Sequence, residues 1–578
     1  MKLSIDSGRT SFLHLLGPNA VSQFYVVSVA SAACTLLTAC TQSDKEQQAK
    51  RPNILLILAD DLGYSDIGCY GGEVQTPNLD RLAANGLRFS RFYNAGRSCP
   101  TRASLLTGLY PHQAGIGRMT FEQNLPGYRG TMTHNGVTIA EVLRSAGYQT
   151  GMIGKWHVAE TPLREDQRLW LAHQVRHEEF APKENYPTHR GFEDFYGTIY
   201  GVVDYFDPFS LVNGEEPVDE VPSNYYSTIA LTDSAISYIN RYSQSENPFF
   251  MYLSYHSPHW PLHALEEDIK KYEDVYKVGW EAIRDARYER MKKLGIFKDY
   301  EEFLTDRRSK SEWEANPDSA WDARAMAVHA AMIDRMDQGI GRVIRALEES
   351  GELDNTLILF MSDNGCSPEI CQNYSPGEND RPDMLRDGAP MIYPKNKEAL
   401  PGPEITYASL GPEWANVANM PFRFWKAKMY EGGICTPAIA HWPDGIKVDK
   451  GLITASTCHI IDVMATVLDL TKAKYPSRYN GNEIQPYEGI SIVPILKEGR
   501  REGHSVIGFE HFNEKALMSF DGWKIIQPGR KAAWELYDLN TDRTERNDVA
   551  AEHPDRLKQM ITDYEAWATR TLVYPAPD

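Results

Sequence analysis

Short, unbroken apolar runs recur along the chain, and each one stops at a cluster of polar residues. Four of these runs have the length and composition of strands that are buried on both faces of a parallel sheet. They cover residues 53–59, 148–153, 249–254 and 357–361. Helical patterns lie between them, at residues 78–85, 137–145 and 321–349. This alternation predicts an α/β fold with a central, mostly parallel sheet flanked by helices.

A second, smaller region follows this pattern, from about residue 497 to residue 578. It holds four short strand candidates, at residues 505–509, 515–518, 523–526 and 534–537. A single helical pattern at residues 554–570 closes the chain. We therefore expect a main domain over residues 51–496 and an α+β subdomain over residues 497–578.

Polar side chains follow all four predicted strands. They are Asp60, Asp61, Lys155, His157, His256, His259, Asp363 and Asn364. Taken singly, each cluster has a plain explanation as a helix cap, a turn or a solvated loop. Because the carboxyl ends of parallel strands meet at one edge of a sheet, where ligands bind in such folds, the four clusters together favour a functional site.

The first 40 residues have the pattern of an export signal. A basic start precedes a run of apolar and small residues at 24–39, which is too short to span a bilayer comfortably. The run ends in Leu37-Thr38-Ala39-Cys40, which resembles a bacterial lipobox. The resemblance implies a lipoprotein signal peptide over residues 1–39 and a lipid anchor on Cys40. Residues 40–50 would be a polar tether. The alternative is an ordinary secretory signal with a chance cysteine.

The composition indicates a globular protein and argues against some classes of partner. Hydrophobic residues make up 42% of the 578 residues and charged residues 24%, as in an ordinary globular protein. The formal net charge of −19 argues against a nucleic-acid partner. An anionic substrate would need positive charge concentrated locally. Among the cysteines of the mature chain, Cys366 and Cys371 are close enough in sequence to pair.

The most specific pattern is Ser98-Cys99-Pro100-Thr101-Arg102, followed by a helical segment that ends in Thr107-Gly108. It closely resembles the sulfatase signature, in which the first residue is oxidised to formylglycine, the third is Pro and the fifth is Arg. Only Ser98 as the first residue puts Pro100 and Arg102 in place. The resemblance thus implies a serine-type sulfatase, and an anaerobic radical enzyme as the partner that matures it.

The likeness to sulfatases runs from about Arg51 to the C-terminus. Its landmarks are Gly154–His157, Pro258–Pro261, Ser362–Gly365 and Lys426, which precedes a Glu431-Gly432-Gly433-Ile434 segment. The resemblance is to bacterial arylsulfatases in the alkaline-phosphatase superfamily. It implies that fold, a C-terminal antiparallel sheet with one helix, and hydrolysis of a sulfate ester to inorganic sulfate and an alcohol. The protein would work in the periplasm or at the cell surface, attached to a membrane only through its lipid.

The resemblance also implies site residues. One Ca²⁺ would be held by Asp60, Asp61, Asp363, Asn364 and the formylglycine derived from Ser98. An all-oxygen set of this kind suits calcium. The catalytic residues would be Ser98, Arg102, Lys155, His157, His259 and Lys426. His259, with help from Lys426, would protonate the leaving alcohol, His157 would act as base when sulfate is released, and the lysines would bind the sulfate oxygens.

Two other functions stay open at this point. The first is a phosphomonoesterase or phosphodiesterase of the same superfamily, with unmodified Ser98 as nucleophile. Two-metal members tend to carry Asp-His where this chain has Asp363-Asn364, which counts against it. The second is a non-catalytic lipoprotein that binds sulfated glycans. The sequence leaves the substrate itself open between a small aryl sulfate, a steroid sulfate and a sulfated glycan.

Overall fold

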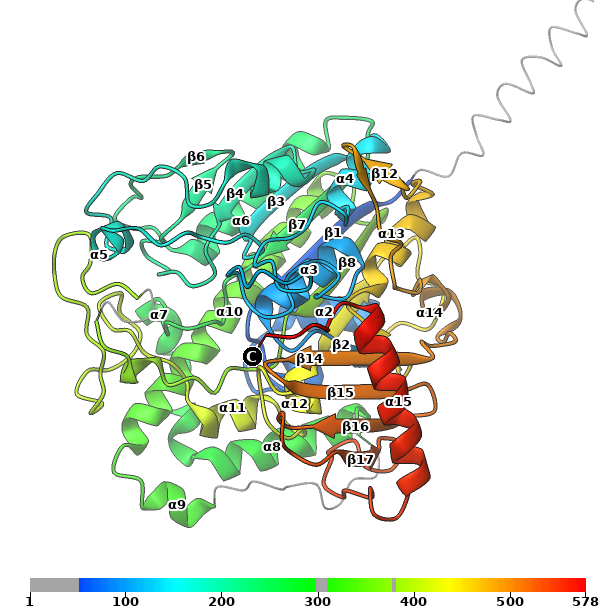
Figure 1. Cartoon of the computed structure of the whole chain (residues 1–578). Coiled ribbons are helices and arrows are strands. Elements are labelled where there is room, and N and C mark those ends of the chain that lie inside the picture. The colour runs from blue at the N-terminus through cyan, green and yellow to red at the C-terminus, as the bar shows by residue number, and fades with distance from the viewer. Residues whose placement is uncertain (1–50, 298–308, 377–380, 578) are drawn as a thin grey trace, which may run out of the picture. The chain divides into compact units, whose positions relative to one another are not determined.

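The structure is a computed structural model that describes residues 51–297, 309–376 and 381–577 (Figure 1). The predicted signal peptide and tether, residues 1–50, lie outside the described residues. Within the described ranges, no helix combines the length and the apolar character that crossing a membrane would require.

The centre of the main sheet is β1 (Asn53–Ala59), with β7 (Phe249–Ser254) on one side and β8 (Thr356–Ser362) on the other. Strand β3 (Gln149–Lys155) pairs with β7. All three pairings are parallel. The register puts Leu58 of β1 opposite the last residue of β7 and next to the end of β8, so the carboxyl ends of these strands are level. These are the four strands that the sequence predicts.

The sheet continues on both sides in the order β10-β2-β9-β8-β1-β7-β3-β4-β5-β6, and β11 pairs with β2. Strand β9 (Cys435–His441) runs antiparallel to both of its neighbours, and β5 and β6 are also antiparallel. The sheet is therefore mixed but mostly parallel, as predicted. The further strands are β2 (Leu87–Tyr93), β4 (Asp194–Thr198), β5 (Leu211–Asn213), β6 (Glu216–Pro217), β10 (Leu452–Thr454) and β11 (Cys458–His459).

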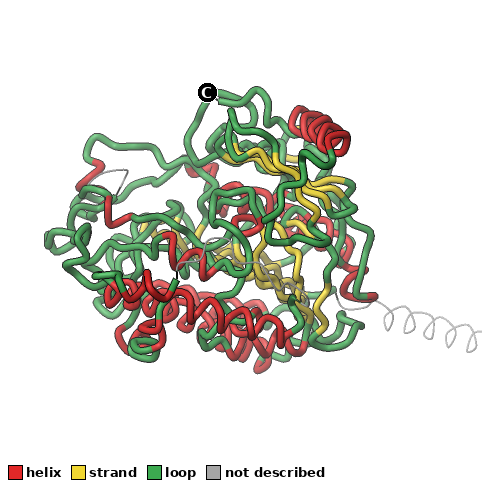
Figure 2. The backbone as a smooth tube through the Cα atoms, turned by 90° about the horizontal axis from the view of Figure 1, so that it is seen from below, coloured by secondary structure: helices red, strands yellow, loops and turns green. Residues whose placement is uncertain are grey.

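Helices cover both faces of this sheet, and Figure 2 shows the long ones in red beside the yellow strands. Alternate residues of β1 point to opposite faces. Leu55 and Ile57 belong to the core shared with α2 (Pro77–Asn85), α6 (Ser227–Tyr242) and α10 (Ser319–Glu349). The opposite core, which contains Ile54, Leu56 and Leu58, is shared with α3 (Ser98–Thr107), α4 (Ile139–Ser145) and α13 (Asp462–Thr471).

The remaining elements are short or peripheral. The helices are α5 (Gln167–Leu171), α7 (Glu266–Ile269), α8 (Trp280–Leu294), α9 (Lys310–Glu314), α11 (Pro412–Ala418), α12 (Glu431–Ile434) and α14 (Val493–Glu498). The 3₁₀ turns are η1 (Gly68–Tyr70), η2 (Lys183–Asn185), η3 (Pro187–Arg190), η4 (Val275–Val278) and η5 (Cys371–Asn373). A small hairpin joins β12 (Arg478–Tyr479) to β13 (Asn482–Glu483).

The C-terminal region forms a separate antiparallel sheet in the order β14-β15-β16-β17, packed against α15 (Pro554–Arg570), drawn orange and red in Figure 1. Gly508 permits this packing, because a Cβ atom there would lie 2.2 Å from the Trp567 ring. The strands are β14 (Val506–His511), β15 (Glu514–Ser519), β16 (Trp523–Gln527) and β17 (Glu535–Asp538).

A buried ion cluster joins this small sheet to the main domain. The Lys524 ammonium group of β16 lies 3.1 Å from Glu431 of α12 and 2.6 Å from Glu545. The backbone amide of Glu431 donates to Glu545, and all three side chains are fully buried. The cluster thus ties α12, which follows the Lys426 segment, to the C-terminal sheet.

The cysteines of the described chain are all free and buried. The disulfide between Cys366 and Cys371 that their spacing allows does not form in this structure. Both thiols lie among packed side chains, where burial raises their pKa and keeps them protonated.

Candidate active site

Ser98 is the first residue of α3, at the edge of the sheet where the parallel strands end. Arg97 before it is extended (φ −151°), and the helix ends at Gly108 in the left-handed conformation (φ 70°). Pro100 fits in the first turn, where backbone N–H groups have no partner within the helix. The sulfatase-like motif therefore folds as a helix start that holds the buried Ser98 side chain in the site.

Oxygen atoms from two strand ends surround the Ser98 hydroxyl. Its Oγ lies 3.1 Å from Asp60 Oδ1, after β1, and 3.3 Å from Asn364 Oδ1, after β8. The side-chain amide of Asn364 donates to Asp61 Oδ1 over 2.6 Å. The backbone N–H of Asp61 donates to Asp363 Oδ1 over 3.2 Å. The four predicted protein ligands are thus linked in one cluster, and two of them contact the Ser98 hydroxyl directly.

Each of the three aspartates also meets a buried cation. Lys155 Nζ lies 2.5 Å from Asp60 Oδ2, Arg102 Nη2 lies 2.7 Å from Asp363 Oδ2, and Lys426 Nζ lies 2.8 Å from Asp61 Oδ1. The chain's own charges in the site are therefore balanced. A bound divalent cation would make the site net positive, which suits an anionic ester inside a chain of net charge −19.

The aspartates are crowded enough to repel one another. Burial raises the pKa of Asp61 to about 7, and the charges of Asp60 and Asp363 add to the rise against the lowering effect of Lys426. Burial and Asp60 likewise raise the pKa of Asp363. Close carboxylates that resist ionising together are what a hard divalent cation stabilises.

The donor set fits such a cation. Ligand atoms of Asp60, Asp61 and His259 all lie within 4.8 Å of one another. Asp363, which the sequence predicts as a ligand, is outside this group of three. Its two oxygens accept from the backbone N–H of Asp61 and from Arg102. Carboxylate oxygens keep further lone pairs, so Asp363 can still serve as a ligand.

A second group of residue types that can bind a metal consists of Asp66, His329 and Cys366. Asp66 Oδ1 pairs with Arg287 over 2.8 Å, and Asp66 Oδ2 lies 3.0 Å from His329 Nε2. The carboxylate is thus matched by protein partners, which is the arrangement of a buried structural ion pair.

His259 lies beside Lys426 on one side of the site. Its Nε2 lies 3.1 Å from Lys426 Nζ and 3.5 Å from Asp61 Oδ2, and its Nδ1 lies 2.5 Å from the Trp260 carbonyl oxygen. Burial, with Lys426 next, lowers the pKa of His259 well below its ordinary value. The neutral ring donates from Nδ1 to the Trp260 carbonyl oxygen, so its Nε2 can accept from the Lys426 ammonium group.

His157 reaches the site from the end of β3 with a left-handed backbone (φ 54°). Burial and the charges of Lys155 and Arg102 lower its pKa well below the ordinary value, so the ring is neutral. Its Nδ1 has no hydrogen-bond partner among the described residues. The ring packs on Gly201, where a Cβ atom would lie 2.2 Å from Nε2.

His256 takes no part in this cluster. Its two ring nitrogens each lie 2.9 Å from a hydroxyl, of Ser227 and of Thr198, so the side chain is fixed between a helix and a strand. Sequence reasoning gives the same interpretation, that His256 is a neighbour of His259 in the loop.

Sequence reasoning misses Arg97 and Glu369, which lie at the side of the site near His259. Glu369 accepts from Arg97 over 3.2 Å and from the Trp260 indole over 2.6 Å. Arg97 could have been found as the residue before Ser98. Glu369 lies in an irregular loop with no spacing to mark it.

Similarity to known proteins agrees with this geometry. The Sulfatase family model matches residues 52–473, and the model described as N-sulphoglucosamine sulphohydrolase, C-terminal, matches residues 422–565. An uncharacterized sulfatase of Schizosaccharomyces pombe is 32% identical over 566 residues, covering 93% of this chain and 96% of that protein. The arylsulfatase of Klebsiella aerogenes is 33% identical over 456 residues, covering 78% and 92%.

Among solved structures, the crystal structure of Ps i-CgsB in complex with k-i-k-neocarrahexaose superposes with a TM-score of 0.62. It is 25% identical and covers 89% of this chain and 92% of that one. The fold and the charge-balanced site define a hydrolase of anionic esters. The chain belongs to the sulfatase family, and the protein is a sulfuric ester hydrolase.

Proposed function

We propose that the protein hydrolyses sulfate esters through a formylglycine made from Ser98, with one Ca²⁺ in the site. The observation that carries this proposal is the position of the Ser98 hydroxyl, within 3.3 Å of Asp60 and Asn364 at the start of α3. A hydrated aldehyde there would supply a nucleophilic hydroxyl and a second hydroxyl that expels sulfate, which serine lacks. Calcium, held by Asp60, Asp61, Asp363, Asn364 and residue 98, would supply Lewis acidity.

The chain's own residues divide the remaining work. Arg102, fixed by Asp363 and by the Lys155 carbonyl oxygen, orients the reacting side chain at position 98. Lys155 and Lys426 offer ammonium groups to the sulfate oxygens, where negative charge grows in the transition state. His259 and Lys426 hold a proton for the leaving alcohol. The neutral His157 accepts the proton that is lost when sulfate is released.

The substrate we propose is an aryl sulfate or a sulfated glycan. Similarity to the Klebsiella arylsulfatase supports the first, and the N-acetylgalactosamine-6-O-sulfatase of Bacteroides thetaiotaomicron, 25% identical over 93% of this chain, supports the second. The lipobox-like segment and the serine motif support export as a lipoprotein, to the periplasm or cell surface, and maturation by an anaerobic radical enzyme.

The metal site gives a direct binding prediction. Asp61→Asn should weaken Ca²⁺ binding at least about tenfold, because it removes a charged ligand from the crowded carboxylates. Isothermal titration of metal-free protein with Ca²⁺ measures this affinity. Asp233→Asn, which changes an exposed carboxylate, should bind like wild type. Two zinc ions per chain together with strong phosphatase activity would indicate the phosphoesterase of the same superfamily instead.

The histidine assignment gives a prediction about leaving groups. His259→Ala should slow an alkyl or sugar sulfate by about 100-fold or more, because a poor leaving group needs the proton. A nitrophenyl sulfate should slow by less than about tenfold, because its leaving group departs without one. Turnover of both substrates measures the difference, with His189→Ala, at an exposed surface position, as the control. Equal losses on both substrates would remove the acid role.

A further inference from the structure

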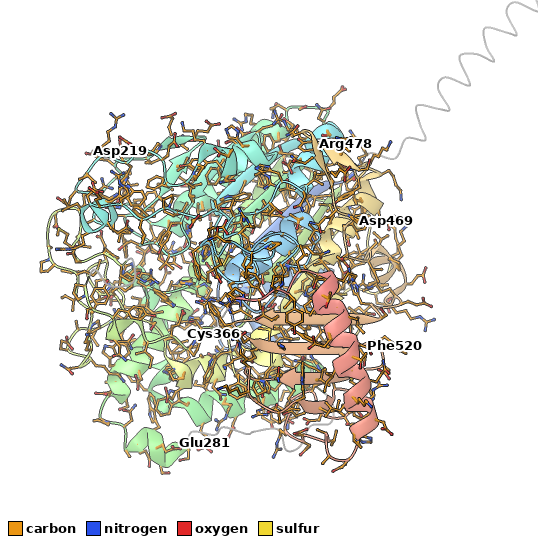
Figure 3. All side chains as sticks on the ribbon, viewed as in Figure 1. Asp219, Glu281, Cys366, Asp469, Arg478 and Phe520 are labelled. Atoms are coloured by element: carbon orange, nitrogen blue, oxygen red, sulfur yellow. The ribbon has the colours of Figure 1, made fainter. Side chains whose placement is uncertain are left out.

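Glu369 connects three segments that each carry a residue of the proposed site. It lies in the loop after β8, a few residues beyond Cys366, which Figure 3 labels. Its Oε1 lies 3.2 Å from Arg97, and its Oε2 accepts from the Trp260 indole over 2.6 Å and lies 3.8 Å from Lys426 Nζ. Arg97 precedes Ser98 and Trp260 follows His259, so one carboxylate contacts the nucleophile segment and the acid segment together.

The loop holds this carboxylate firmly in place. The Ser367 hydroxyl donates to Glu369 Oε2 over 2.9 Å, and the Ser409 hydroxyl donates to the Glu369 carbonyl oxygen over 2.5 Å. The side chain is about one-fifth exposed. Burial alone would raise the pKa of Glu369, but Lys426 and Arg97 outweigh it and keep the pKa well below its ordinary value. The group is thus a fixed anion at the edge of the site.

The contacts of Glu369 help to fix the positions of His259 and Lys426. The His259 and Trp260 rings lie 4.8 Å apart, so fixing the indole also fixes one side of the imidazole. Lys426 Nζ lies between Asp61 Oδ1, at 2.8 Å, and Glu369 Oε2, at 3.8 Å, with His259 Nε2 at 3.1 Å. Without Glu369, Asp61 would be the remaining anion in contact with that ammonium group among the described residues, so Lys426 would lose one of the two anions that fix its position beside His259.

We propose that Glu369 is a positioning residue that keeps Lys426 and His259 aligned on the leaving-alcohol side of the site. The proposal rests on the proposed function, because it assigns the leaving-group proton to this pair. Glu369 does not touch the reacting atoms. The loss of kcat in a Glu369 variant should therefore grow with the basicity of the leaving alcohol. A purely structural role would lower kcat equally for all leaving groups.

The test is Glu369→Gln, which keeps the side-chain shape and removes the charge. We expect kcat for an alkyl sulfate to fall by about 10- to 100-fold, as for other residues that orient a reacting group. For a nitrophenyl sulfate, kcat should change by less than about threefold, and KM should stay the same for both substrates. Glu369→Asp, which keeps the charge, should recover part of the alkyl sulfate activity.

Matched controls separate this idea from the proposed function and from misfolding. Glu348→Gln makes the same change in an exposed ion pair with Arg81 and should alter neither rate. Trp260→Phe removes the indole N–H that donates to Glu369, together with part of the ring, and should shift the ratio of the two rates in the same direction as Glu369→Gln. Equal losses on both substrates, or no loss on either, would overturn the positioning role. A wild-type protein without sulfate-ester hydrolysis would overturn the proposed function instead.

Discussion

Ser98→Ala should lower kcat/KM for a nitrophenyl sulfate by roughly 10⁴-fold or more, because it removes the only atom from which the nucleophile can form. The Ser98 hydroxyl contacts both Asp60 and Asn364, and alanine at this position has no oxygen atom to replace it. Initial rates of the variant and the wild type, both produced with the maturing enzyme, measure the loss.

Cys99→Ala is the matched control, one residue along the same helix. Cys99 is fully buried in the core beneath α3, where burial raises its pKa to about 11 and keeps the thiol neutral. Removing it should cost stability of about 1 kcal/mol and change kcat/KM by less than about threefold. Activity that survives Ser98→Ala and disappears in Cys99→Ala would show that the motif begins at Cys99.

Lys524→Met should lower the free energy of unfolding by about 3–5 kcal/mol, because it removes the cation that lies between two buried carboxylates. Lys524 lies between Glu431 and Glu545, at 3.1 and 2.6 Å, with no exposed surface on any of the three side chains. Methionine has nearly the same length, so lost packing contributes little. Urea unfolding followed by circular dichroism measures the change.

Lys472→Met is the control for this substitution. Lys472 pairs with Asp469 at 2.9 Å but is 79% exposed, so solvent screens the pair and its loss should cost less than about 0.5 kcal/mol. The Lys524 variant should also lose activity at temperatures where the wild type is stable, because α12 follows the segment that carries Lys426. A Lys524 variant as stable as the control would show that the cluster does not join the C-terminal sheet to the main domain.

Much of the fold could be predicted from the sequence because the central strands are nearly pure apolar runs. The predicted run at 53–59 coincides with β1, and the predicted helix at 554–570 coincides with α15. Strand β9 was missed. Its residues, Cys435–His441, include a proline and two alanines, and only pairing with β2 and β8 makes them a strand. Such a preference comes from the tertiary context.

The site residues that could be predicted from the sequence are the polar residues at the carboxyl ends of predicted strands. Asp60 and Asp363 directly follow β1 and β8, and Lys155 is the last residue of β3, so the register of the sheet brings them together. Glu369 could not be placed in this way, because an irregular loop determines where its side chain points. The contact between Glu369 and Trp260 joins residues 109 positions apart and depends on the folded loop.

The mass of the tryptic peptide that begins at Ser98, taken from protein made in its native host, is the most direct test of the proposed chemistry. Trypsin cleaves after Arg97 and Arg102, so the peptide contains residues 98–102. We expect it to be lighter by two hydrogen atoms than its sequence implies, because oxidation of the serine alcohol to an aldehyde removes two. An unmodified serine in a preparation that hydrolyses sulfate esters would contradict a formylglycine at position 98.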